Sequence, residues 1–202
     1  AGIAHGAYDG VVELGWDNLE ADGTANVMIA ELFRGPSLAF KDWGMRPAVA
    51  LLDYFLTRDQ VVGNVVVCTS GDTGPSLLES AKGMASLRTF VLFPSGRVSR
   101  TQAAQMRSFS DARACVFEVA GADSDALDDV AARALADDRL APHTNTTSLQ
   151  RRISSMNSFN VARIVFSIPH FFATVFRAER EGVDLSRGLC LVIPSGALGN
   201  AF

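Results

Sequence analysis

The sequence of 202 residues contains few of the residues that build disulfide frameworks or metal centres, with three cysteines and three histidines. The cysteines, Cys68, Cys115 and Cys190, lie far apart, each in a short apolar run. We interpret them as small buried hydrophobic residues in a reducing compartment, and we expect a cytoplasmic protein. The histidines have no partner at metal-ligand spacing, so we expect no metal site.

Long apolar runs and runs of basic charge are also missing. No uninterrupted apolar run approaches the roughly 18 residues that a bilayer span needs, and no secretory signal opens the chain. Lysine and arginine are scattered, and the formal net charge is −4. These features argue against a nucleic-acid surface and a polybasic membrane patch. Since 48% of the residues are hydrophobic and 20% are charged, the chain is an ordinary globular one, long enough for an enzyme domain.

Short apolar runs alternate with helical patterns along the chain. The runs predict strands at Met28–Phe33, Asn64–Thr69, Thr89–Phe93, Cys115–Val119 and Leu189–Ile193. Helices are expected at 38–56, 76–82, 99–109 and 124–135, and over a long region at 153–181 that is interrupted near Pro169. Residues 1–27 are an irregular lead-in or the remains of a hairpin. The alternation predicts an α/β fold, a parallel sheet with helices on both faces, whose ligands collect beyond the carboxyl ends of the strands.

Lys41 follows a Gly35-Pro36 turn, and Ser37 is placed to cap a helix that begins at Leu38. In the first turn of that helix, the free N–H groups would favour the neutral amine of Lys41, and Phe40 and Trp43 could add desolvation. A neutral, partly dry lysine suits Schiff-base chemistry with an aldehyde cofactor. The alternative is an ordinary lysine on a helix surface.

The segment Glu31–Asp42 (ELFRGPSLAFKD) resembles the sequence around the pyridoxal-phosphate lysine of threonine synthases. Only Arg34 and Ser37 differ from the usual sequence of the family in this segment. The resemblance implies that Lys41 holds pyridoxal 5'-phosphate (PLP) covalently. It also implies the tryptophan-synthase-β-like architecture of PLP fold type II.

The segment Thr69–Gly74 (TSGDTG) follows a predicted strand and offers one carboxylate and hydroxyl groups between two glycines. By itself it fits a turn that caps the next helix through Asp72. It is also similar to the family's TSGDTG motif. That similarity implies that Asp72 lies near the ring hydroxyl of the cofactor and Thr73 near the substrate phosphate.

The segment Ser195–Asn200 (SGALGN) follows the last predicted strand and has the glycines of an anion cradle, although such glycines often serve only the shape of a turn. It resembles the family's loop for the cofactor phosphate. The resemblance assigns cofactor binding to Gly196, Ala197, Leu198, Gly199 and Asn200. Ala197 departs from the asparagine of the family, so one side-chain contact would be lost while backbone donors remain.

The segment Ser154–Arg163 places Asn157, Ser158 and Asn160 in an apolar region, where a helix start or a ligand must explain them. It resembles a family segment that contacts the phosphate of the substrate. The resemblance assigns Asn157, Ser158 and Arg163 to substrate binding, and arginine suits this task because it pairs with phosphate in a bidentate manner. Asn157 and Ser158 as helix caps remain the alternative.

Together with Phe93–Ser99 (FPSGRVS), these segments follow the family's order over residues 27–202. We therefore expect residues 28–202 to form a PLP-binding region that is incomplete at both ends relative to the family. The implied activity, a step of threonine biosynthesis, converts the phosphorylated amino acid O-phospho-L-homoserine and water to L-threonine and phosphate, with a homodimer as a family tendency. Two alternatives stay open, a related phospholyase that makes 2-oxobutyrate and a non-catalytic fragment that keeps the fold.

Overall fold

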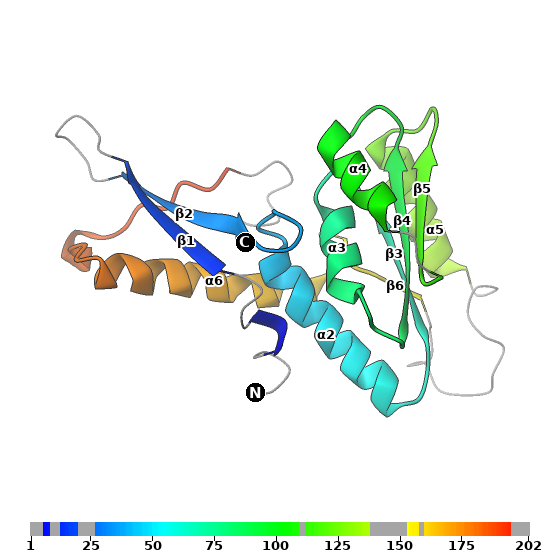
Figure 1. The fold of residues 1–202 in the computed structure, drawn as a ribbon, viewed down its shortest axis with the longest axis horizontal. Coiled ribbons are helices and arrows are strands. Elements are labelled where there is room, and N and C mark those ends of the chain that lie inside the picture. The colour runs from blue at the N-terminus through cyan, green and yellow to red at the C-terminus, as the bar shows by residue number, and fades with distance from the viewer. Residues whose placement is uncertain are drawn as a thin grey trace.

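A computed structural model of the protein describes residues 6–8, 13–19, 27–109, 112–137, 153–157 and 160–194 (Figure 1). Four strands form a parallel sheet in the order β5-β4-β3-β6. Their bounds are β3 (Gly63–Cys68), β4 (Leu87–Pro94), β5 (Ala114–Val119) and β6 (Ile153–Ser155). The predicted parallel sheet is confirmed.

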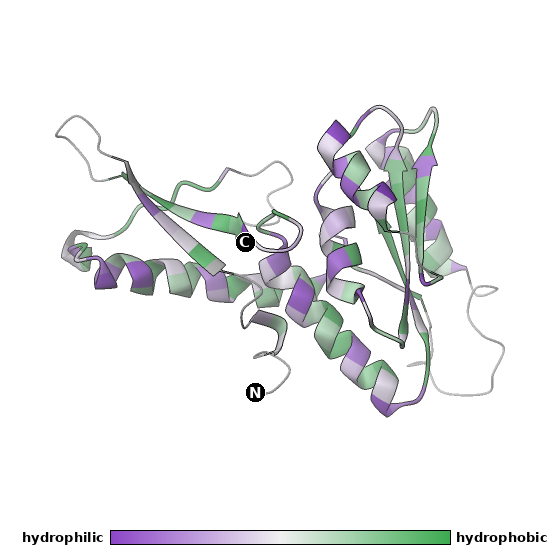
Figure 2. Ribbon diagram, in the orientation of Figure 1, coloured by the Kyte–Doolittle hydropathy of each residue, from purple (hydrophilic) through white to green (hydrophobic). Residues whose placement is uncertain are grey.

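Helices cover both faces of this sheet. One face carries α2 (Asp42–Arg58), α3 (Thr73–Ala81) and α4 (Arg100–Ser108), and the other carries α5 (Ser124–Ala136) (Figure 1). The central strands are coloured as hydrophobic along most of their length (Figure 2). Strands that are buried on both faces need this composition, because neither set of side chains meets water.

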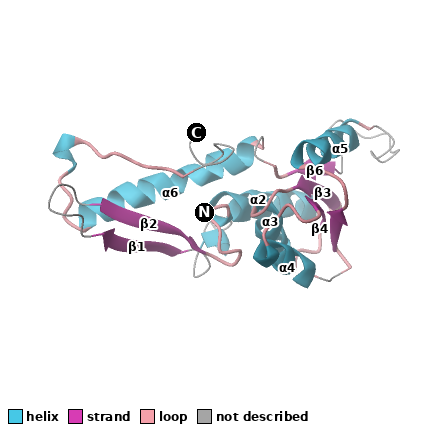
Figure 3. Cartoon of the chain, turned by 90° about the horizontal axis from the view of Figure 1, so that it is seen from above, coloured by secondary structure: helices cyan, strands magenta, loops and turns pink. Residues whose placement is uncertain are grey.

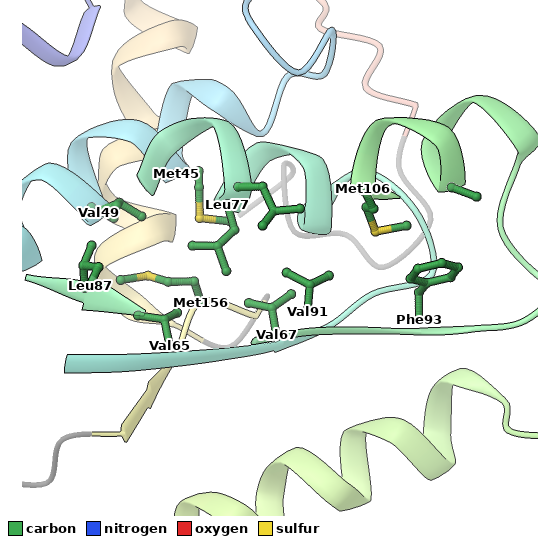
Figure 4. Packing of buried hydrophobic residues seen from close by; sticks show 13 residues of the cluster. Met45, Val49, Val65, Val67, Leu77, Leu87, Val91, Phe93, Met106 and Met156 are labelled. Atoms are coloured by element: carbon green, nitrogen blue, oxygen red, sulfur yellow. The ribbon is translucent and has the colours of Figure 1, made fainter. Parts of the chain in front are cut away.

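The core follows the alternation of side chains along β3. Val65 and Val67 point toward α2, α3 and α4, where they pack with Met45, Leu77 and Met106 (Figure 4). The alternate residues Val66 and Cys68 point to the opposite face, where they pack with Leu127 and Ala131 of α5. The period of two in the strand thus distributes one apolar run over two cores.

A second part of the molecule extends away from the sheet. It contains a hairpin of the antiparallel strands β1 (Glu13–Leu19) and β2 (Val27–Arg34), with α6 (Val161–Arg180) beside it (Figures 1 and 3). The hairpin alternative for the start of the chain is therefore the correct one. α6 packs against α2, which joins this part to the sheet.

Length and composition would also allow α6 to cross a membrane. The sequence analysis missed this property because it considered only uninterrupted apolar residues. Arg163 and His170 of this helix are buried, with 6% and 3% exposure, and His170 contacts Trp43 of α2. These contacts make α6 a packing partner of α2 within this fold.

Three expectations about elements were wrong. Ile153–Ser155 is the strand β6 and not helix, because it pairs with β3. α6 continues through Pro169 without interruption, since one missing N–H is tolerated in a helix of 20 residues that packs on a neighbour. Leu189–Ile193 forms no strand, because it pairs with none of the described strands, and Val192 is 89% exposed.

Smaller differences concern a helix cap and a cysteine. The helix expected at 124–135 is α5, and the Asp123 side chain caps it by accepting from the Ala126 N–H at 2.9 Å. Cys68 is buried as expected, whereas Cys115 is only partly buried and Cys190 is exposed. The described cysteines are all free thiols.

Candidate active site

Lys41 lies at the N-cap of α2, directly before the helix, and not within its first turn. The helix does not begin at Leu38, because the backbone of Leu38 has a φ of +59°, a left-handed conformation that interrupts a right-handed helix. Two short turns precede the helix, closed by bonds from the Leu38 N–H to the Gly35 carbonyl and from the Asp42 N–H to the Ala39 carbonyl. Lys41 therefore stands at the end of a strained loop.

The Asp42 carboxylate, which the sequence analysis did not single out, holds this loop. It is completely buried and accepts from the Ser37 N–H at 2.9 Å, the Ser37 hydroxyl at 2.6 Å and the Ser76 hydroxyl of α3 at 2.7 Å. Ser37 thus donates to a carboxylate and does not cap a helix that starts at Leu38. A Cβ atom at Gly35 would lie 2.6 Å from Asp42 Oδ2, so this position accepts only glycine without a shift.

The surroundings of Lys41 favour its neutral amine. Burial, the largest cause, lowers the pKa of Lys41 below 10.5, the charge of Arg163 lowers it further, and the Asp72 carboxylate raises it. The Lys41 Nζ atom lies 5.5 Å from the centre of the Phe40 ring. The structure therefore brings together Lys41, Asp72 and Arg163, which come from three separate segments of the sequence.

The turn that contains Asp72 is organised by Thr69. The Thr69 hydroxyl oxygen accepts from the N–H groups of Gly71 at 3.0 Å and Gly74 at 3.3 Å, and its hydrogen is donated to the Gly71 carbonyl. Asp72 occupies the N-cap position of α3, but its side chain makes no capping bond. Its Oδ1 atom accepts from the Gln102 Nε2–H of α4 instead. The capping alternative for the Asp72 side chain is therefore wrong, and Thr73 is the first residue of α3.

Arg163 and Asn157 lie beyond the carboxyl end of β6. The Arg163 guanidinium donates to the Met156 carbonyl at 2.9 Å, and burial lowers its pKa to about 10. Asn160 caps α6, accepting from the N–H groups of Ala162 and Arg163. The capping alternative therefore applies to Asn160 and not to Asn157.

Asn157 is buried, and its amide nitrogen donates to Asp128 Oδ1 at 3.0 Å. Because a carboxylate only accepts hydrogen bonds, the amide oxygen must face the other way. Among the described residues, nothing donates to this Oδ1 atom. A buried, unpaired acceptor of this kind is costly, which suggests a ligand or a further part of the protein as its partner.

The two polar turns lie at one edge of the sheet. β3 runs parallel to β6, with Asn64 beside Ile153 and Val66 beside Ser155. The carboxyl ends of these neighbouring strands therefore point the same way and deliver Asp72 and Asn157 to the same edge, as expected for ligand sites in such sheets. The remaining predicted site residues, Ser158, Gly196, Ala197, Leu198, Gly199 and Asn200, lie outside the described residues.

Sequence reasoning missed Asp42 and Gln102. The signal for Gln102 was present, because Ser99 and Gln102 have the spacing of a capping box, and both bonds of that box form. Asp42 ends the segment around Lys41, but its bond to Ser76 spans 34 positions, so no local pattern predicts that contact. Within the described part of the chain, no group of histidine, cysteine or acidic residues has the arrangement of a metal site.

No family model matches the sequence. Among curated proteins, threonine synthase-like 2 of Xenopus laevis is 36% identical over 179 residues, which cover 87% of this chain and 34% of that protein. Threonine synthase of Saccharomyces cerevisiae is 32% identical over 183 residues, again 87% of this chain and 34% of the relative. The chain thus spans about a third of the length of the curated relatives it matches.

Solved threonine synthase structures also match nearly the whole of this chain with only part of their own length. PLP-bound threonine synthase of Brucella melitensis superposes with a TM-score of 0.73 at 29% identity, covering 98% of this chain and 39% of that structure. Threonine synthase from yeast gives a TM-score of 0.74 at 28% identity, covering 98% of this chain and 38% of that structure. Diaminopropionate ammonia lyase of Escherichia coli, with a TM-score of 0.64 at 14% identity, shares the fold. The architecture is that of fold type II enzymes, as predicted.

Proposed function

We propose a function from the premise that this chain belongs to the threonine synthase family: it binds PLP through Lys41 and takes part in the conversion of O-phospho-L-homoserine and water to L-threonine and phosphate. The observation that carries the proposal is the partly buried amine of Lys41, whose pKa is lowered by burial and on which the charges of Asp72 and Arg163 act in opposite directions. Relatives at 36% and 32% identity match 87% of the chain, which supports the same assignment.

The described residues fit PLP, which carries an aldehyde, a ring hydroxyl and a phosphate. Lys41 supplies an amine whose pKa is lowered by burial, which increases the share of the neutral form that attacks an aldehyde. Asp72 supplies a carboxylate at the same edge of the sheet, suited to the ring hydroxyl. Residues 196–200 complete the proposed site as the cradle for the cofactor phosphate.

When bound, PLP would withdraw electrons from the substrate and make its carbon-bound protons acidic. The neutral Lys41 amine is the group that would accept such a proton and return it to another carbon, acting as a general base and then as a general acid. Its lowered pKa keeps more of the amine neutral at a given pH, which serves the base role, and it makes the ammonium a stronger acid for the return of the proton.

Arg163 is the proposed anchor for the substrate phosphate, aided by Thr73 and Ser158. The Arg163 guanidinium is buried, and its Met156 contact fixes the head group in place. A fixed guanidinium stabilises the charge of a departing phosphate without reorganising. Asn157 is proposed to bind another part of the substrate. Its unpaired Oδ1 atom is an acceptor, which suits a donor such as the substrate ammonium better than a phosphate oxygen.

The test begins with cofactor attachment. The purified protein is mixed with PLP, its absorbance spectrum is recorded, the adduct is reduced with borohydride, and peptides are mapped by mass. The chain contains lysine only at positions 41 and 82, so Lys82→Ala is a matched control for Lys41→Ala. We expect the absorbance band and the label to vanish in Lys41→Ala alone; a label that persists in that variant contradicts the assignment.

Product analysis then separates the three candidate functions. With O-phospho-L-homoserine, threonine synthase activity releases threonine and phosphate in equal amounts. Release of 2-oxobutyrate instead identifies the phospholyase alternative. Attachment of PLP to Lys41 with neither product identifies a chain that keeps the fold and the cofactor without turnover.

A further inference from the structure

We propose that Gln102 of α4 is a positioning residue that fixes the Asp72 carboxylate toward Lys41. The inference rests on the proposed function, because Asp72 and Lys41 are assigned there as residues of the PLP site. Gln102 belongs to none of the sequence segments that carry the family resemblance. Its hydrogen bond to Asp72 joins residues that are 30 positions apart in the sequence.

The orientation of the Gln102 amide is determined by its two partners. Its Oε1 atom accepts from the Ser99 N–H at 3.2 Å, and its Nε2–H is donated to Asp72 Oδ1 at 2.5 Å. A backbone N–H only donates and a carboxylate only accepts, so exchanging the amide oxygen and nitrogen would break both bonds. The capping box of α4 thereby holds a donor that points at Asp72.

The Asp72 turn is shaped to admit this side chain. A Cβ atom at Gly71 would lie 2.7 Å from Gln102 Nε2, and Gly71 does not have the positive φ that would by itself require glycine. Glycine at this position therefore leaves room for the glutamine. One turn later in α4, the Gln105 Nε2–H is donated to the Ser37 carbonyl at 3.3 Å, so the same helix contacts both the Asp72 turn and the Lys41 loop.

Asp72 needs such a partner because its side chain makes no capping bond in its own helix. The carboxylate acts on Lys41 by charge, in the direction opposite to burial and to Arg163. A carboxylate that is free to rotate would place its charge at varying distances from the amine, and Coulomb interaction weakens with distance. Fixing Asp72 therefore sets how much of the Lys41 amine is neutral.

The experiment measures the Lys41 amine directly and without PLP. Protein labelled with [ε-13C]lysine gives two side-chain signals, from Lys41 and from Lys82, whose side chain is 70% exposed and serves as the internal reference. The pKa of each lysine is read from the pH titration of its signal. We expect Gln102→Met, which keeps the size of the side chain and removes its polar atoms, to lower the Lys41 pKa by about half a unit to one unit while Lys82 is unchanged.

A double-mutant cycle distinguishes positioning from a general structural effect. If Gln102 acts through Asp72, Gln102→Met causes no further change in an Asp72→Asn background. Ser99→Ala is the matched control, because it removes the hydroxyl of the same capping box but keeps the backbone N–H that orients Gln102. It should lower the melting temperature and leave the Lys41 pKa unchanged.

Three results would overturn the inference: an unchanged Lys41 pKa in Gln102→Met, an equal shift in the Asp72→Asn background, or an equal shift in Ser99→Ala. Should Gln102→Met fail to fold, Gln102→Asn replaces it, since its amide is too short to reach both partners. Failure of PLP to attach to wild-type Lys41 would refute the proposed function and leave this titration fully interpretable.

Discussion

The buried Asp42 carboxylate offers a sharp test of how the Lys41 loop is held. In Asp42→Ala, one N–H and two hydroxyls of Ser37 and Ser76 lose their acceptor in a site that water does not reach. A hydrogen bond to a charged group contributes about 1.5–3 kcal/mol, and hydroxyls that rotate to other acceptors recover part of it. We therefore expect a loss of about 4 kcal/mol, a large share of the 5–15 kcal/mol typical of a domain.

Asp42→Asn should cost about half as much, roughly 2 kcal/mol. The amide keeps the shape and one acceptor atom, which can serve both hydroxyls on the Oδ1 side. Its nitrogen must then face the Ser37 N–H, where two donors meet. Ser76→Ala, which removes a single donor, should cost about 1.5 kcal/mol or less.

The assay is urea unfolding followed by circular dichroism, with PLP attachment to Lys41 measured on the same samples. Asp59→Ala is the control at the other end of α2, because Asp59 directly follows the helix and its exposed side chain pairs with Arg58, and such pairs contribute little. A loss below about 1 kcal/mol in Asp42→Ala, or equal losses in the alanine and asparagine variants, would refute the role assigned to this carboxylate.

Three further predictions concern other parts of the molecule. Burial lowers the Lys41 pKa in the folded protein, so between the folded pKa and 10.5 the unfolded chain binds more protons than the folded one. The free energy of unfolding should therefore rise with pH in this window. Urea unfolding midpoints measure the rise, and Lys41→Met should abolish it. Burial raises the Cys68 thiol pKa to about 11, so iodoacetamide at pH 8 should alkylate exposed Cys190 well before Cys68, and equal rates by mass spectrometry would contradict this. Gly44→Ala places a Cβ atom 2.5 Å from the Arg163 carbonyl and should cost about 1–3 kcal/mol in thermal unfolding by separating α2 from α6.

Local sequence patterns predicted the central elements of the sheet because each pattern is complete within one segment. β3, β4 and β5 are continuous apolar runs, and the capping box at Ser99 marks the start of α4. β6 is only three residues long and becomes a strand through its pairing with β3, a contact that no local pattern encodes. Leu189–Ile193 is the opposite case, since its composition favours a strand and the described structure offers it no partner.

The site shows the same division. The motifs predicted Lys41, Asp72 and Arg163 as site residues, and in the structure the charges of Asp72 and Arg163 both act on the Lys41 pKa. The roles of Asp42 and Gln102 were missed, because the bonds that tie them to α3 and to Asp72 span 34 and 30 residues, although Asp42 also accepts from nearby Ser37. A hydrogen bond between distant segments leaves no periodicity in the sequence, whereas a motif of adjacent residues does.

The packing of α2 on α6 explains why the Lys41 amine has two opposing neighbours. Gly44 lies three residues after Lys41, and without a side chain there the backbone of α6 comes close enough for the Arg163 charge to lower the Lys41 pKa. On the other side, α4 holds Asp72, whose charge raises that pKa. Two independent contacts thus set one proton affinity in opposite directions. Loosening the α2–α6 contact with Gly44→Ala should therefore raise the Lys41 pKa, whereas removing the Gln102 bond should lower it, and shifts of the same sign would show that the amine responds to burial alone.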